Sequence, residues 1–476
     1  MKAKPTTQRP NTRSIARESG TLAACLRVAL TVAAAMTPAL VTAPASGQLT
    51  VPDSTSAQRP AAALSIGDAA RIAARNSAPA QSALARVAEA RAREQQSRAD
   101  LLPSVNGAAS QFTRTLNTAS FGFSLPGLNP NGQIIGPFHI LDIRASAAVP
   151  LFNPGAFARY HAAGAQVMAS SAAATQASEQ AGAQAALAYV QALRAEDDFR
   201  ARSEDTVLAA DLVRVAQAQL QAGTGVALDV TRAQAQLASA RAVLISSRGA
   251  RDRSLIALSR TLNLPPHTPL VLSDSLGKMD TSVIATDEAA ATQRALSSRP
   301  DVLAAEARVA AARQSVSAIR AERLPSVSLV GDDGGNGLSA RHLLNTYEIG
   351  LQVSVPILDG FRRSGRVQEQ QGVVREAEIQ QRDLEQQASA DVSTAILDVH
   401  SASEQVAATR EQLRLAEQEV SQARERFRAG VAGNADVITA LLQLTSARTA
   451  VIGAQTNFQT ARIALARAQG IVTTLP

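Results

Sequence analysis

Side chains that could bind a metal or act as nucleophiles are few in this sequence and widely scattered. The five histidines share no paired spacing on one predicted helix; they are His139, His161, His267, His342 and His400. Zinc needs ligands gathered at one point, so we expect no metal and no cofactor. Gly223-Thr224-Gly225 follows a predicted helix and not a strand, which argues against a dinucleotide-binding turn. No constellation for enzyme catalysis is present in the sequence.

Two acidic positions have a clearer local role. Asp229 and Asp436 each follow a glycine-containing turn, at the predicted start of a helix. Aspartate is favoured at the N-cap because its carboxylate accepts hydrogen bonds from free backbone N–H groups. The residues alone therefore indicate an N-cap at both positions.

The segment Asp332-Asp333-Gly334-Gly335-Asn336-Gly337 is rich in acidic side chains and glycine. It lacks the ligand ladder and the closing glutamate of an EF-hand calcium loop. Asp, Asn and Gly are turn residues, and the segment lies between two predicted strands. We therefore predict an extracellular hairpin tip here.

Composition favours long helices over a thick globular core. The 476 residues are 46% hydrophobic but only 3% aromatic, with no Trp, and alanine supplies much of the apolar share. Alanine is the strongest helix former and permits close packing. The net charge is +7, of which the first 45 residues carry +5. The remaining basic residues are not clustered and have no aromatic partners for base stacking, so nucleic-acid binding is not expected.

The N-terminus has the pattern of a secretory signal peptide. A basic region ends near Arg27, an apolar stretch runs from Val28 to Val41, and Ala43-Pro44-Ala45 matches a cleavage site. The only cysteine, Cys25, precedes the apolar stretch, so its likeness to a lipoprotein box is accidental. Its removal with the signal peptide would leave the mature chain without thiols, as suits an oxidising compartment.

The chain contains an internal repeat. Leu102-Pro103-Ser104-Val105 returns as Leu324-Pro325-Ser326-Val327, and Ala222-Gly223 followed by Asp229-Val230 returns as Ala429-Gly430 followed by Asp436-Val437. Each copy has a helical stretch, two strand-like runs, a very long helix, a turn and a returning helix. Such repeats decide the architecture of a chain.

The long helices carry a seven-residue repeat of large and small side chains. In the second returning helix the large residues are Val437, Leu444, Val451, Phe458 and Leu465, and an alanine follows each by three positions. This spacing predicts a closely packed coiled coil. A helix of this kind with about 65 residues would be roughly 100 Å long.

The strand-like runs alternate apolar and polar residues over about the length that crosses a bilayer as tilted strands. Tyr347, Ile349, Leu351, Val353 and Val355 alternate with Glu348, Gly350, Gln352 and Ser354. Four strands cannot close a barrel, and open edges are not tolerated in lipid. Two chains would give eight strands and three would give twelve, and the residues do not choose between them.

The whole pattern resembles the TolC-like outer-membrane efflux protein family. The resemblance rests on Ser298-Arg299-Pro300-Asp301, the two Leu-Pro-Ser-Val strand starts, Gly350-Leu351-Gln352-Val353-Ser354-Val355-Pro356-Ile357, and the duplicated Ala-Gly turns. It spans roughly residues 64–470. The fold it implies is mainly α with membrane β: helical hairpins forming a periplasmic tunnel, and four strands per protomer in a shared 12-stranded trimeric barrel.

The resemblance also implies partners. A homotrimer would sit in outer-membrane lipid with its helical part in the periplasm. The tips would meet a periplasmic adapter, which couples the duct to an inner-membrane pump. The tip residues implied for adapter contact are Gly223, Thr224, Gly225, Val226, Gly430, Val431 and Gly433.

The same resemblance implies an aperture closed by side chains near the tips. The matching positions are Asp229, Asp436 and Phe427, where Phe427 replaces a tyrosine of the family pattern, and Arg232 could pair with Asp229 one turn away. Ala432 and Thr439 also depart from the pattern. A ring of Asp436 carboxylates would favour cations at a narrow opening. Two interpretations of Asp229 and Asp436 stay open, an N-cap alone or an N-cap that also faces this opening.

The function expected is therefore a passive exit duct for small molecules or proteins, and not an enzyme. The alternatives are a periplasmic adapter or a structural coiled-coil protein. The exported compound is not readable from the sequence.

The expected organisation is a signal peptide at 1–45, a flexible segment at 46–63, repeat 1 at 64–263 (strand pair 104–150, hairpin 157–262), a linker at 264–286, repeat 2 at 287–470 (strand pair 326–356, hairpin 362–469) and a tail at 471–476.

Overall fold

The computed structural model describes residues 63–121, 132–266, 268–277 and 287–475. The predicted signal peptide, nearly all of the 46–63 segment and part of the linker lie outside the described residues.

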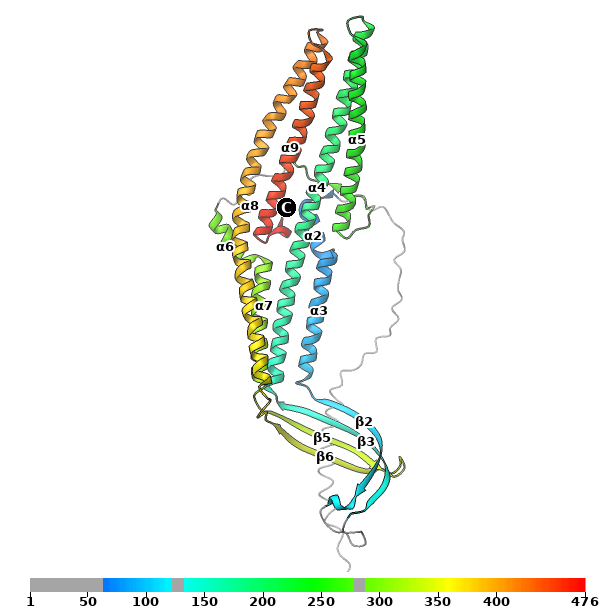
Figure 1. The fold of residues 1–476 in the computed structure, drawn as a ribbon, viewed down its shortest axis with the longest axis vertical. Helices are drawn as coiled ribbons and strands as arrows, with labels where there is room; N and C mark the ends of the chain where they lie inside the picture. The colour runs from blue at the N-terminus through cyan, green and yellow to red at the C-terminus, as the bar shows by residue number, and fades with distance from the viewer. Residues whose placement is uncertain (1–62, 122–131, 267, 278–286, 476) are drawn as a thin grey trace, which may run out of the picture. The chain divides into compact units, whose positions relative to one another are not determined.

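The described chain consists of helical hairpins joined to one antiparallel sheet (Figure 1). The helices are α2 (Ile66–Asn76), α3 (Ala78–Ala99), α4 (Pro154–Gln221), α5 (Ala227–Thr261), α6 (Glu288–Ser298), α7 (Pro300–Ala321), α8 (Arg362–Arg428) and α9 (Asn434–Ala468). The strands of the sheet are β2 (Ser104–Asn117), β3 (Ile134–Phe152), β5 (Ser326–Gly337) and β6 (Leu344–Ser354). Two short strands, β1 (Ala63–Leu64) and β4 (Val271–Leu272), pair in parallel. Short 3-10 turns lie at Thr118–Phe121 and Val472–Thr474.

Local signals explain where the helices begin and end. The Asn153 side chain accepts a hydrogen bond from the Ala156 N–H, and Pro154 occupies the first turn of α4, where its missing N–H costs nothing. Ser77 ends α2 and also caps α3 by accepting from the Ala80 N–H. The helical stretch predicted at the start of repeat 1 is thus divided into two helices, because a serine with extended backbone interrupts it.

The predicted fold class is confirmed, and the seven-residue pattern marks the buried seam. All ten residues of that pattern in α9 are buried, from Val437 to Ala468. In α5 only Ala233, Ser247 and Leu258 of the corresponding positions are buried. The returning helix of the second hairpin, α9, is therefore more buried than its counterpart α5.

The sheet has the order β2-β3-β5-β6, and every neighbouring pair is antiparallel. The prediction of a turn at residues 332–337 is wrong. These residues belong to β5, and the chain reverses after Gly337. Within the described residues, the outer edges of β2 and β6 have no strand beside them.

The Ser-Arg-Pro-Asp motif joins α7 to α8 through a largely buried cation. Arg299, whose side chain is 9% exposed, forms two hydrogen bonds to Asp301 at 2.8 and 2.9 Å and one to Asp391 at 2.8 Å. Burial raises the pKa of Asp301, but the hydrogen bonds and charge of Arg299 outweigh this effect and hold the pKa below its ordinary value.

Acidification should therefore weaken this junction. Because the pKa of Asp301 is lower in the folded chain, its ionised form stabilises the fold above the unfolded pKa of about 4, and this contribution is lost as pH falls through the folded value. We expect the Tm difference between wild type and Asp301→Asn to shrink as pH falls from neutral toward 3. A difference independent of pH would contradict this assignment.

Candidate functional site at the hairpin tips

Each long hairpin turns through a glycine in the left-handed region. Gly223 and Gly430 have φ of 71° and 70°, which a residue with a Cβ adopts only at a cost. The following N–H groups donate back to the ends of the helices, from Thr224 to Gln219 O and from Val431 to Arg426 O. These bonds satisfy the carbonyls left free at a helix C-terminus.

The tips present apolar side chains to solvent. Val226 is 58% and Val431 is 69% exposed, and Leu228 is exposed beside Val226. Two valines at the very end of hairpins cover little of the protomer itself. They therefore leave an exposed apolar surface at the hairpin tips.

The aspartates after the turns are not N-caps. The N-cap residues of α5 and α9 are Val226 and Gly433, neither of which caps by its side chain. Asp229 and Asp436 lie in the first turn instead, where the positive end of the helix dipole favours a carboxylate. Asp436 is exposed and Asp229 is half-buried.

The expected pairing of Asp229 with Arg232 is not formed. Arg232 is exposed, and no ion pair links it to Asp229 in the part of the chain that the structure describes. A surface ion pair contributes little free energy. The spacing of three residues between Asp229 and Arg232 is therefore not sufficient to form the pair.

Phe427 corrects a second expectation. It is 5% exposed and packs in an apolar cluster with Val420, Val437 and Leu441. The cluster also contains residues of α4 and α5, so all four long helices share it. A phenylalanine has no hydroxyl to hold in a polar aperture, and burial in this core is the more stable place for its ring. Phe427 is therefore a core residue of the protomer and does not line an opening.

Two side chains that the sequence analysis did not single out tie the tips together. Asn434 is fully buried and donates from Nδ2 to the carbonyl oxygen of Asp229 at 2.8 Å. Gln219 donates from Nε2 to the carbonyl oxygen of Phe427 at 2.9 Å. Each bond crosses from one hairpin to the other over more than two hundred residues of sequence. No spacing in the sequence could have revealed these contacts.

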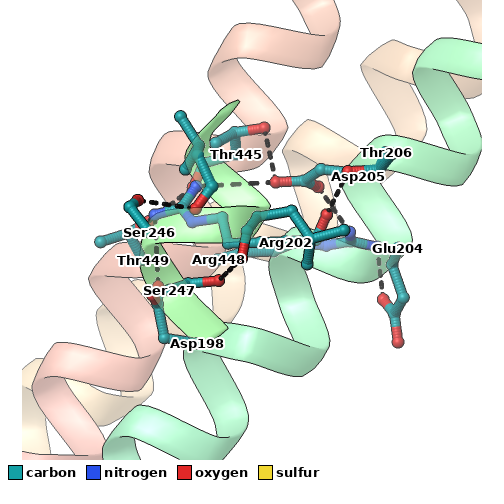
Figure 2. Close-up of polar contacts among 12 residues, drawn as sticks. Asp198, Arg202, Glu204, Asp205, Thr206, Ser246, Ser247, Thr445, Arg448 and Thr449 are labelled. Carbon is teal, nitrogen blue, oxygen red and sulfur yellow. Dashed lines mark hydrogen bonds and ion pairs between the residues drawn. The ribbon is translucent and has the colours of Figure 1, made fainter. Parts of the chain in front are cut away.

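A network of charged side chains joins the hairpins again farther from the tips (Figure 2). Asp205 of α4 accepts from Arg448 Nη1 of α9 at 2.8 Å and from the Thr445 hydroxyl at 3.0 Å. Arg202 lies 3.6 Å from Asp205 and donates to the Thr449 hydroxyl at 2.9 Å. Only 13–18% of the Asp205, Arg202 and Arg448 side chains is exposed. A further ion pair, Asp211–Arg424 at 3.5 Å, links α4 to α8.

These features define a class of protein in which long helical hairpins are joined to a four-stranded antiparallel sheet. The sequence profile of the family described as "Outer membrane efflux protein" matches residues 70–264 and 291–471, one stretch in each copy of the repeat, and the chain belongs to this family. It is located in the outer membrane, with its helical part in the periplasm. Proteins of this family and fold are efflux channels and not enzymes. Membership sets aside the adapter and structural coiled-coil alternatives.

Individual relatives agree with this assignment. Protein CyaE of Bordetella pertussis is 29% identical over 297 residues, covering 60% of each chain. Outer membrane efflux protein BepC of Brucella suis is 26% identical over 302 residues, covering 61% of this chain and 63% of BepC. This chain therefore aligns with less than two thirds of the length of these relatives. The structure of the Campylobacter jejuni CmeC outer membrane channel has the same fold, with a TM-score of 0.70, 18% identity and 85% of both chains covered.

Proposed function

We propose that the protein is a passive exit duct that works as a homotrimer. The observation that carries this proposal is the sheet: four strands of 11–19 residues, apolar on one face, with both outer edges unpaired in the described chain. Unpaired backbone groups in lipid cost several kcal/mol each, so the edges must be closed by other copies. Three copies, the number implied by the family resemblance, would give a barrel of twelve strands.

In this proposal the hairpin tips bind a periplasmic adapter, which connects the duct to an inner-membrane pump. The exposed Val226 and Val431 offer an apolar contact at the hairpin ends, beside the glycine turns at Gly223 and Gly430. The duct itself catalyses no reaction, and the pump supplies the energy. Small molecules or proteins are the cargo.

The aperture of this duct is formed by Asp436, Asp229 and Arg232. Asp436 is the strongest candidate because its carboxylate is exposed next to the turn, while the neighbouring Val437 is buried. Three Asp436 carboxylates around one axis would attract cations and repel anions.

Replacement of Asp436 by alanine tests both the duct and its aperture. Purified protein in planar bilayers should form stable, cation-preferring pores, and Asp436→Ala should reduce the cation-to-anion permeability ratio at least about twofold at low salt, where charges are least screened. Asp436→Glu, which keeps the charge, is the matched control and should behave as wild type.

The outcomes separate the two claims. Pores whose selectivity does not change in Asp436→Ala would keep the duct and leave Asp436 with only its interaction with the α9 helix dipole. Folded protein that forms no pores in any bilayer would refute the duct.

A further inference from the structure

The membrane sheet has one mainly apolar and one mainly polar face, and the strand register identifies both. Leu329 pairs with Leu351, Val327 with Val353, and Gly331 with Ile349. The apolar face thus carries large exposed side chains; among them are Val105, Ile143, Leu329, Tyr347, Ile349, Leu351 and Val353. Asp333 is an acidic exception on this face, opposite Tyr347. In an outer-membrane barrel the apolar face must contact lipid, so the other face lines the inside.

Four charged residues lie together on that inner face. Ser110, Asp142 and Asn336 share one line across the sheet, Arg144 and Gly334 share the next, and Asp332 and Glu348 share the third. We call Asp142, Arg144, Asp332 and Glu348 the barrel charge set. They come from three neighbouring strands, β3, β5 and β6, which belong to both copies of the repeat.

Arg144 is held in a built position within this set. Its guanidinium donates to both oxygens of Asp142 at 2.9 and 3.0 Å and to Asp332 Oδ1 on the next strand at 2.7 Å. Gly334 lies directly opposite Arg144, and a Cβ there would fall 2.4 Å from the Arg144 Cβ and from the Ile143 carbonyl oxygen. The absence of a Cβ at Gly334 therefore leaves room for the Arg144 side chain, which extends to Asp332.

Glu348 breaks a rule of strand pairing. It stands directly opposite Asp332, another carboxylate, and like charges in this position are destabilising. Arg144 neutralises part of this charge through Asp332. Among the described residues Glu348 has no ion-pair partner of its own. The barrel charge set therefore contains three carboxylates and one guanidinium. Neutral residues at these positions would avoid the repulsion between Asp332 and Glu348.

We propose that the barrel charge set determines ion selectivity at the outer-membrane end of the duct, with Glu348 supplying the uncompensated charge and Arg144 setting how much of it remains. This inference rests on the proposed function, because the set faces a lumen only if copies of the chain close a barrel. It adds a selectivity element at the opposite end of the chain's fold from Asp436.

Charge-neutral variants measured under a salt gradient test the proposal. At low salt the Debye length is long compared with its value of about 10 Å at 0.1 M, so wall charges act across more of a wide lumen. We expect Glu348→Gln to lower the potassium-to-chloride permeability ratio by roughly twofold and Arg144→Gln to raise it, with both effects fading at high salt. Thr346→Ser, an uncharged change two residues from Glu348 on the same face, should leave the ratio unchanged.

Each result decides the proposal. Opposite shifts in Glu348→Gln and Arg144→Gln support it, and Glu348→Gln alone is sufficient if Arg144→Gln fails to assemble. Conducting pores whose ratio is unchanged in Glu348→Gln, while Asp436→Ala still shifts it, would overturn the inference and keep the duct. Folded wild-type protein without pores would overturn the proposed duct and this inference with it.

Discussion

Replacing Phe427 with alanine should lower the free energy of unfolding of the helical part by about 3–5 kcal/mol, the usual cost of removing a buried phenylalanine ring. The ring lies in the cluster shared by α4, α5, α8 and α9, next to Val420, Val437 and Leu441. Phe427 is the second-last residue of α8, but its neighbours come from all four long helices, so the gap can close only if packed helices shift. Thermal unfolding followed by circular dichroism in detergent measures the loss.

The matched control is Phe427→Leu, which keeps an apolar side chain and should cost less than about 1.5 kcal/mol. Asp436→Ala provides the opposite comparison, since it should alter permeation with little change in stability. If Phe427→Ala left the unfolding temperature unchanged but altered conductance, Phe427 would face the aperture after all, and its placement in the core would be refuted.

The architecture could be predicted because its signals are local and repeated. The alternation in β6 and the seven-residue pattern in α9 each depend on which side of one element a residue faces. Duplication of the same order of elements made each copy a check on the other. Even so, Ser77, whose backbone is extended, separates α2 from α3, where the sequence pattern predicted one helical stretch.

The site was predicted less well because its contacts join distant parts of the chain. Asn434 follows Gly433 and looks like a turn residue, yet it is buried against the Asp229 carbonyl of the other hairpin. Residues 332–337 have the composition of a turn, but Gly334 lies within a strand because Arg144 needs the space opposite. In both cases a tertiary contact, absent from the local sequence, overrides the ordinary preference of the residue.

The structure couples the two hairpins of a protomer at several levels. The shared apolar cluster, the hydrogen bonds from Gln219 and Asn434, and the network around Asp205 all connect the first hairpin to the second. A carboxylate at the centre of such a network holds two guanidinium groups near each other. Its removal leaves Arg202 and Arg448 with only their second partners, Asp198 at 3.3 Å and Glu204 at 3.2 Å, in a place that is largely shielded from water.

We therefore expect Asp205→Ala to destabilise the protomer by about 2 kcal/mol, less than the 3–5 kcal/mol of a fully buried pair because some solvent reaches the site. Arg448 would also keep Glu204, at 3.2 Å, as a partner. The double variant Asp205→Ala/Arg448→Met removes the cation that has lost its main partner and should be more stable than Asp205→Ala alone, since replacing both members of a buried ion pair with apolar side chains costs less than removing one of them. Unfolding temperatures of the two single variants and the double variant give the coupling directly. If the two single losses simply add in the double variant, Asp205 and Arg448 do not stabilise each other, and the network of Figure 2 does not connect the hairpins energetically.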